Sequence, residues 1–178
     1  MEIFKVIIHT HGGDRYIDNV VNYILDGRQE RAKGYGVNPY DPDIAAMQMK
    51  RTARYFNNQN KTPLFHYVTS YSPETAPTPE KALELTDKVF SNITDSHQAL
   101  IGIHSEKQAK SLNHAHTVVN PTDFNTGKMI YGDNSTNYSI AQRMADVTGQ
   151  PTKLIVRKED ETEWECPRVF VPHDSAAD

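Results

Sequence analysis

The chain has 178 residues, of which 37% are apolar and 24% charged, so it is long enough for one water-soluble domain with a sizeable core. A mean hydropathy of −0.66 without a long apolar run excludes a membrane-spanning helix. A net charge of −4 argues against a broad basic surface for nucleic acid, so any such contact has to be local. Cys166 is the only cysteine, which excludes an internal disulfide framework and fits a reducing cytoplasm; no secretory leader is expected.

The first third of the chain is expected to form a strand followed by two helices. Residues 4–10 are rich in β-branched side chains and predict a strand that ends at Gly12 and Gly13. Residues 28–42 hold glycine, proline and charges and are expected to form a loop. Asp43 is suited to cap a second helix that runs to residue 57. Apolar residues at helical spacing predict the first helix over residues 15–26, with one face made of Ile17, Val20, Val21, Ile24 and Leu25.

The remainder of the chain alternates between strands and two further helices. Thr78 followed by Pro79 is typical of a helix start, and this helix should reach residue 93. A last helix is expected over residues 136–147, before Gly149. Strands are expected over residues 64–71, 98–104 and 114–120, with 128–131 and 153–156 as further candidates.

This order of elements predicts an α+β fold with a central, mostly antiparallel five-stranded sheet and flanking helices. The domain is expected to span residues 1–157. Residues 158–178 are expected to form an acidic C-terminal tail, and whether part of it is ordered stays open at this point.

Three histidines are the most informative feature, in the stretch IGIHSEKQAKSLNHAHTVVN. His114 and His116 are two residues apart on an expected strand, so both side chains lie on one face of the sheet. His104 ends the preceding strand, and the residues between can form a hairpin that returns the chain beside it. Three imidazoles that converge on one face can hold a divalent ion and leave open coordination positions. The alternative is that these are ordinary solvent-exposed histidines of a strand.

The same stretch resembles the signature of HUH endonucleases, in which a third histidine precedes a His-hydrophobic-His pair. More closely, the chain is similar to the relaxase/mobilisation nuclease family of conjugative plasmids and integrative conjugative elements, over residues 3–150. Three blocks carry the resemblance in the family's order: NVVNYILDGRQE, FHYVTSYSPETAPTPEKALEL and HQALIGIHSEKQAKSLNHAHTVVNPTDFNTGK. The resemblance implies a central antiparallel sheet with helices packed on the other face.

The resemblance also implies site- and strand-specific DNA nicking at a transfer origin. A tyrosine attacks the scissile phosphate and remains joined to the 5′ end, while a divalent ion held by His104, His114 and His116 polarises the phosphate. An all-imidazole set suits Mn²⁺ better than Mg²⁺, which prefers oxygen. Tyr23 matches the family's tyrosine. Tyr16 lies seven residues earlier on nearly the same helical face and stays an alternative, as does a structural role for both.

The second block supplies three further candidates. Ser70 lies where the family keeps a serine that contacts DNA near the nick. His66 shares its strand face and is expected either to orient the tyrosine or the phosphate, or to be a hydrogen-bonded core histidine. Glu74 is the best candidate for a base or for a partner of a ligand histidine, and its alternative is a solvated loop acid.

DNA-binding side chains are expected in local clusters, each with a solvated surface as the alternative. Basic side chains beside aromatic ones suit single-stranded DNA. The candidates are Lys50, Arg51 and Arg54 on the second helix, Arg28 and Arg31 after the first, and Lys107 between the metal histidines. The resemblance further implies accessory relaxosome proteins and a type IV secretion coupling protein as partners. It also implies a bacterial cytoplasmic protein carried on a mobile genetic element, without membrane insertion.

Two other functions remain open from the sequence. A rolling-circle replication initiator or transposase of the HUH type would use the same chemistry at a different DNA origin. A catalytically inactive module would keep the fold and only bind single-stranded DNA. Retention of the three histidines together with Tyr23 argues against the inactive module.

Overall fold

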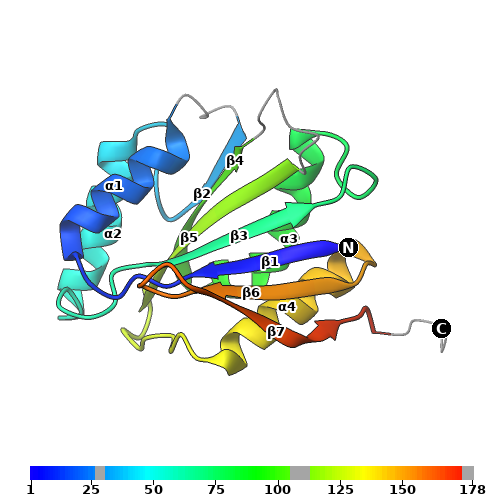
Figure 1. The fold of residues 1–178 in the computed structure, drawn as a ribbon. Helices are drawn as coiled ribbons and strands as arrows, with labels where there is room; N and C mark the ends of the chain where they lie inside the picture. The colour runs from blue at the N-terminus through cyan, green and yellow to red at the C-terminus, as the bar shows by residue number, and fades with distance from the viewer. Residues whose placement is uncertain (27–30, 105–112, 174–178) are drawn as a thin grey trace.

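One mixed sheet organises the molecule, as a computed structural model describing residues 1–26, 31–104 and 113–173 shows (Figure 1). Its seven strands lie in the order β2-β4-β5-β3-β1-β6-β7. All neighbours are antiparallel except β1 and β6, which are parallel. The strands are β1 (Glu2–Ile7), β2 (Ala32–Tyr35), β3 (Phe65–Tyr71), β4 (His97–His104), β5 (Asn113–Asp123), β6 (Thr152–Arg157) and β7 (Glu163–Phe170).

Each face of the sheet packs against one pair of helices. Helices α3 (Pro79–Thr94) and α4 (Asn134–Thr148) cover one face and enclose the larger core. Helices α1 (Gly13–Leu25) and α2 (Pro42–Tyr55) pack over β4 and β5 on the opposite face, around a second apolar cluster. The expectation that helices lie on a single face was therefore wrong, because the apolar stripe of α1 needs its own sheet surface to bury it.

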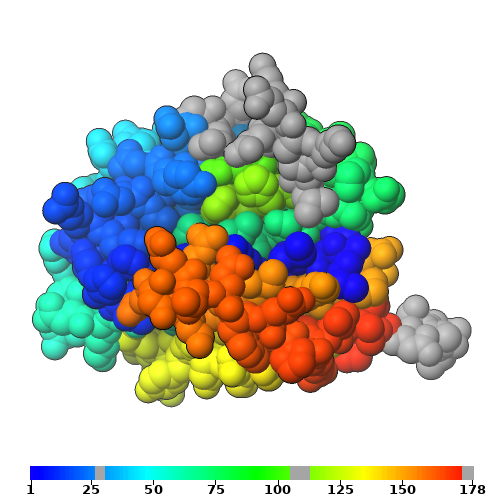
Figure 2. All heavy atoms as spheres, viewed as in Figure 1, coloured from blue at the N-terminus to red at the C-terminus, as the bar shows by residue number. Residues whose placement is uncertain are grey.

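On the α1 and α2 face, the sheet is covered by helices only in part. Side chains of β1 and β6 alternate between buried positions and half-buried ones, and the half-buried ones lie on this face. Figure 2 shows atoms of β1, β6 and the hairpin to β7 at the surface, beside rather than beneath α1. This uncovered part of the sheet, over β3, β1, β6 and β7, is called the open face below.

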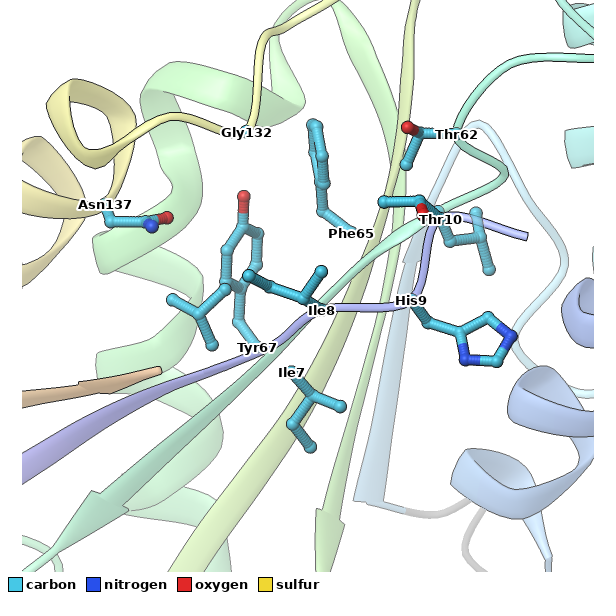
Figure 3. Close-up of a pocket in the computed structure, with 11 residues that line it drawn as sticks. Ile7, Ile8, His9, Thr10, Thr62, Phe65, Tyr67, Gly132 and Asn137 are labelled. Carbon is cyan, nitrogen blue, oxygen red and sulfur yellow. The ribbon is translucent and has the colours of Figure 1, made fainter. Parts of the chain in front are cut away.

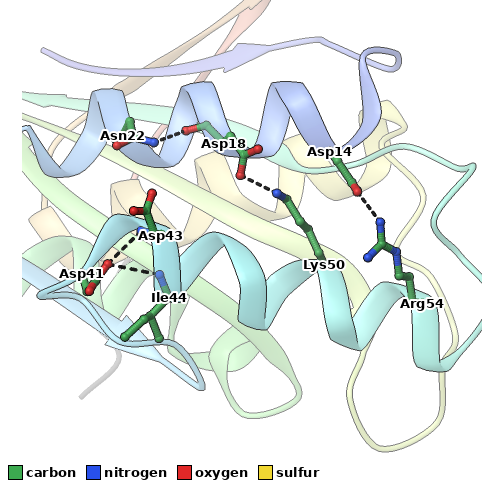
Figure 4. Close-up of polar contacts among 8 residues, drawn as sticks. All are labelled: Asp14, Asp18, Asn22, Asp41, Asp43, Ile44, Lys50 and Arg54. Carbon is green, nitrogen blue, oxygen red and sulfur yellow. Dashed lines mark hydrogen bonds and ion pairs between the residues drawn. The ribbon is translucent and has the colours of Figure 1, made fainter.

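Capping side chains determine where helices α2 and α3 begin. Asp41 caps α2 by accepting hydrogen bonds from the backbone N–H groups of Asp43 and Ile44, so the expected cap at Asp43 was wrong by two residues (Figure 4). Thr78 caps α3 as predicted. Among the described ranges, no helix has the length and apolar run that crossing a bilayer requires.

The expected count of five strands was too low. Two strands were not expected, β2 and β7, and one expected strand does not form in full. Residues 32–35 form β2 within the expected loop, where Gly34 is required because a Cβ would lie 2.4 Å from the carbonyl oxygen of Val37. The expected strand at 128–131 reduces to one bridge between Thr122 and Met129. Strand β7 lies in the stretch expected as an acidic tail, and Pro167 is tolerated there because β7 is an edge strand.

Strand β7 completes the larger core, and we expect the domain to need it. Phe170 is 1% exposed and packs in this core, 5.6 Å from the ring of Tyr138, whereas the neighbouring Val169 is 39% exposed. Phe170→Ala should therefore lower the free energy of unfolding by about 3–5 kcal/mol. Val169→Ala should change it by about 0.5 kcal/mol or less. Urea unfolding of both variants checks this, and equal effects would mean that the domain ends before β7.

Candidate metal and nucleophile site

Strand pairing brings three histidines together on the open-face side of the sheet. In the antiparallel pairing of β4 with β5, His104 lies opposite His114 and Gly102 lies opposite His116. His104 and His116 are buried, and His114 is half-buried. One possible ligand atom from each ring lies within 4.8 Å of the other two.

This donor set fits one divalent ion. Imidazole nitrogens bound to an ion at about 2.1 Å are at most about 4.2 Å apart, so small ring rotations suffice to reach a common centre. Three neutral nitrogen donors leave positions for oxygen ligands from water or substrate. The residues present therefore fit a metal site that the three histidines would hold, with positions left for oxygen ligands.

A fourth histidine contacts this cluster from β3. The Nε2 atom of His66 is hydrogen-bonded to Nδ1 of His116 at 2.9 Å. Burial, assisted by the charges of His104 and Arg157, lowers the pKa of His66 to about 4, so its ring is neutral at pH 7. A neutral His66 that accepts this hydrogen bond leaves Nε2 of His116 for a metal, as in the usual pairing of a ligand imidazole with an outer partner.

Tyr23 lies at the edge of the histidine cluster. Its side chain is 51% exposed, and its ring meets those of His104 and His116 edge-on, with centroid distances of 5.1 and 5.3 Å. Helix α1 holds this position because the neighbouring Ile24 packs fully buried in the α1–α2 cluster. The phenol is thus fixed by its helix at one side of the possible metal position and open to solvent on the other.

Gly102 allows α1 to pack closely on β4, a role that was not predicted from the sequence. A Cβ at Gly102 would lie 2.6 Å from Cγ2 and 2.8 Å from the carbonyl oxygen of Ile24. Gly102 also faces His116 across the strand pair. A glycine inside a strand pattern is the signal that could have identified it, because such a glycine often marks close backbone approach.

Tyr16 has a different environment from Tyr23. Its ring stacks on His9 with a centroid distance of 3.8 Å, and His9 in turn stacks on His11 at 4.5 Å. Its hydroxyl is buried without a hydrogen-bond partner among the described residues. Burial raises the pKa of Tyr16 to about 12, which makes its phenolate harder to form. The structure therefore brings Tyr23, and not Tyr16, to the three histidines.

The two further candidates from the second sequence block, Ser70 and Glu74, lie in different parts of the structure. Ser70 lies opposite His114 in the β3–β5 pairing, half-buried and on the same face. Glu74 is exposed in the turn after β3 and lines a hollow with Lys81 and Thr148, which come from α3 and α4. The structure thus brings Ser70 to the cluster and does not bring Glu74 to it.

The cations of α2 are largely engaged with α1. Lys50 is paired with Asp18 and Arg54 with Asp14, in ion pairs that connect the two helices (Figure 4). Arg51 is exposed on α2, and Arg31 is exposed just before β2. Arg28 and Lys107 lie outside the described residues. Lys50 and Arg54 therefore already have acidic partners within the protein.

A separate cavity of about 140 Å³ opens at the far end of β1 (Figure 3). Phe65, Tyr67, Ile8 and His9 are among the residues that line it. Its lining includes none of the three clustered histidines.

The comparisons agree with this geometry at the level of family. A family model described as Relaxase: MobA/VirD2-like, nuclease domain matches residues 22–150, which include Tyr23 and all three histidines. Neither the curated proteins nor the solved structures contain a match. The resemblance inferred from the three sequence blocks is confirmed by the family model.

We predict one divalent ion at the three histidines. Replacing His114 and His116 together by alanine should weaken Mn²⁺ binding by more than about 100-fold, because two of three nitrogen donors are lost. The matched control is His173→Ala, which removes an exposed histidine paired with Asp146. Titration calorimetry measures both variants. An unchanged Mn²⁺ affinity in the double variant would contradict the assignment.

Proposed function

The chain belongs to the relaxase family of MobA/VirD2-like nuclease domains, and from this premise we propose that Tyr23 nicks one DNA strand at a transfer origin and becomes joined to its 5′ end. Membership makes the chain a DNA-nicking enzyme that acts on single-stranded DNA, in a metal-dependent family. The choice of nucleophile and of ligands is our proposal. The contact of Tyr23 with the rings of His104 and His116 carries it.

The proposed step is a transesterification. The phenolic oxygen of Tyr23 bonds to phosphorus while the bond from phosphorus to the 3′ oxygen breaks, and the phenol proton ends on the released 3′ hydroxyl. The number of phosphodiester bonds is unchanged, so the reverse reaction rejoins the strand. A phenol is a weak nucleophile at neutral pH and has to be held in line with the phosphate.

We propose His104, His114 and His116 as the ligands of a divalent ion, Mn²⁺ in preference to Mg²⁺ because all three donors are nitrogen. When bound, such an ion supplies positive charge that stabilises the phosphoryl oxygens as negative charge develops on them. His66 acts as a positioning residue, since its hydrogen bond fixes the ring of His116.

Ser70 is proposed to contact the DNA beside the nick, because it lies in the same cross-strand row as His114 and remains half-exposed. Glu74 is not proposed as the base, given its position beside α3 and α4. On family membership alone, we also propose accessory relaxosome proteins and a type IV secretion coupling protein as partners. The same membership supports a place in the bacterial cytoplasm, on a mobile element.

Tyr23→Phe should abolish nicking of labelled single-stranded origin DNA in Mn²⁺, because the substitution keeps the ring on His104 and His116 and removes only the attacking oxygen. Tyr16→Phe is the matched control. It should nick at nearly the parent rate, since its hydroxyl makes no hydrogen bond within the described residues and its loss is close to neutral. Nicking at the parent rate by Tyr23→Phe would favour a different nucleophile, and loss in the control alone would point to Tyr16.

Gly102→Ala tests whether the approach of α1 matters. The added methyl would overlap Ile24 and push α1 from β4, at a cost of about 1–3 kcal/mol in the free energy of unfolding. Displacement of the phenol by even about 1 Å should lower the nicking rate about 100-fold. The Mn²⁺ affinity of the same variant is the internal control and should stay near the parent value. Nicking at the parent rate would show that the position of α1 is not limiting.

A further inference from the structure

The open face of the sheet continues directly from the histidine cluster and carries cations. On β1 and β6 the half-buried side chains of this face are Ile3, Lys5, Ile7, Lys153, Ile155 and Arg157. Helices α1 and α2 pack over β4 and β5 instead, and among the described residues their apolar cluster contains none from β1 or β6. This face is therefore available to a ligand that also reaches the histidines.

Strand register connects these cations to the site. Val68 lies between His116 and Lys5 in one cross-strand row. Ile7 lies between His66 and Arg157 in the next row. Two strand spacings are about 10 Å, so each cation lies about that far from a histidine on the same face.

Both rows lie on the face of the sheet that carries the three histidines. Lys5 and Arg157 thus lie beside the site rather than on a remote surface, within reach of a strand whose phosphate is held at the histidines.

A carboxylate from β7 lies between these two cations. Glu163 pairs with Lys5 and, at 3.3 Å, with Arg157, and its side chain is 42% exposed. The hydrogen bond from Lys5 holds the pKa of Glu163 below its usual range, so it is ionised at neutral pH. Two cations around one anionic oxygen is also the arrangement that binds a phosphate oxygen of nucleic acid.

We propose that Lys5 and Arg157 form a phosphate-binding site for the DNA strand that runs from the nick across the open face, and that Glu163 occupies it until the strand displaces it. This proposal rests on the proposed function, because the bound strand is the substrate of the proposed nicking reaction. Displacement breaks two ion pairs before phosphate contacts form, so Glu163 weakens DNA binding and favours release of the strand. Because the chain has a net charge of −4, DNA has to be bound by local groups of cations, and Lys5 and Arg157 form such a group.

The chain offers a matched control on the other side of the sheet. Glu84 on α3 also pairs with two cations, Lys81 at 3.4 Å and Lys88 at 3.3 Å. Helix α3 packs on the face opposite the open face. Glu84→Gln and Glu163→Gln therefore change the net charge equally, each by freeing two cations, but only one of them does so beside the site.

The test is equilibrium binding of a fluorescent 20-nucleotide oligothymidylate at low salt, measured by anisotropy. All variants carry Tyr23→Phe, so that strand cleavage does not enter. Glu163→Gln should tighten binding about fivefold to tenfold, as expected for removing two partly exposed ion pairs that compete with DNA. Glu84→Gln should stay within about twofold of the parent, as for a charge change far from the bound strand.

A double-mutant cycle completes the experiment. With Lys5→Gln and Arg157→Gln present, binding should weaken, and Glu163→Gln should no longer tighten it. Thermal unfolding of each variant verifies that it is folded. Equal effects of Glu163→Gln and Glu84→Gln, no effect of either, or tightening that persists without the two cations would each overturn the proposal. Nicking by the Tyr23 parent is measured separately, so failure of this inference is distinguishable from failure of the proposed function.

Discussion

The register between β4, β5 and β3 is the constraint on which the site depends. It sets His104 opposite His114, and it aligns Val68 and Ser70 with His116 and His114 on the same face. Because side chains alternate along a strand, a slip of one residue would turn the paired histidines of β5 into the core beneath α3 and α4. Ala115 between them and Thr117 after His116 are fully buried and hold the register from the other side.

A second constraint brings the phenol to this row. Helix α1 packs so closely on β4 that only glycine is accommodated at position 102. Ion pairs from Lys50 and Arg54 of α2 to the acidic side chains of α1 connect the two helices, so they pack on the sheet as one unit. An exposed tyrosine on a rigid helix is a suitable nucleophile, because its position is fixed without its hydroxyl being buried. Tyr16, seven residues earlier on the same helix, stacks on His9 instead.

Local patterns in the sequence were enough for the α+β class, the four helices and the clustering of three histidines. The H-x-H spacing fixes a shared face by alternation alone, and one apolar stripe defines α1. Other features depend on contacts distant in the sequence. Strand β2 has a weak pattern and forms because β4 offers an edge, and β7 forms through pairing with β6 despite Pro167 and its acidic residues.

The positions of the basic candidates and of the cations of the open face also depend on contacts between residues that are distant in the sequence. Whether Lys50 reaches DNA or Asp18 depends on how α2 packs against α1, which no short motif encodes. Lys5 and Arg157 are separated by most of the chain. Lys5 becomes a neighbour of the site through the pairing of β1 with β3, and Arg157 through the parallel pairing of β1 with β6. Glu74 follows a strand that leads to the histidines, yet its turn directs it to the hollow beside α3 and α4.

The identity of the residue that becomes joined to DNA tests the central claim most directly. The intact chain is incubated with single-stranded origin DNA and Mn²⁺, digested with protease and nuclease, and the peptide bearing the nucleotide is identified by mass spectrometry. The account predicts a 5′-phosphotyrosine at Tyr23, and its absence when Mn²⁺ is chelated. A modified peptide containing Tyr16, or strand cleavage without any protein-linked nucleotide, would contradict it.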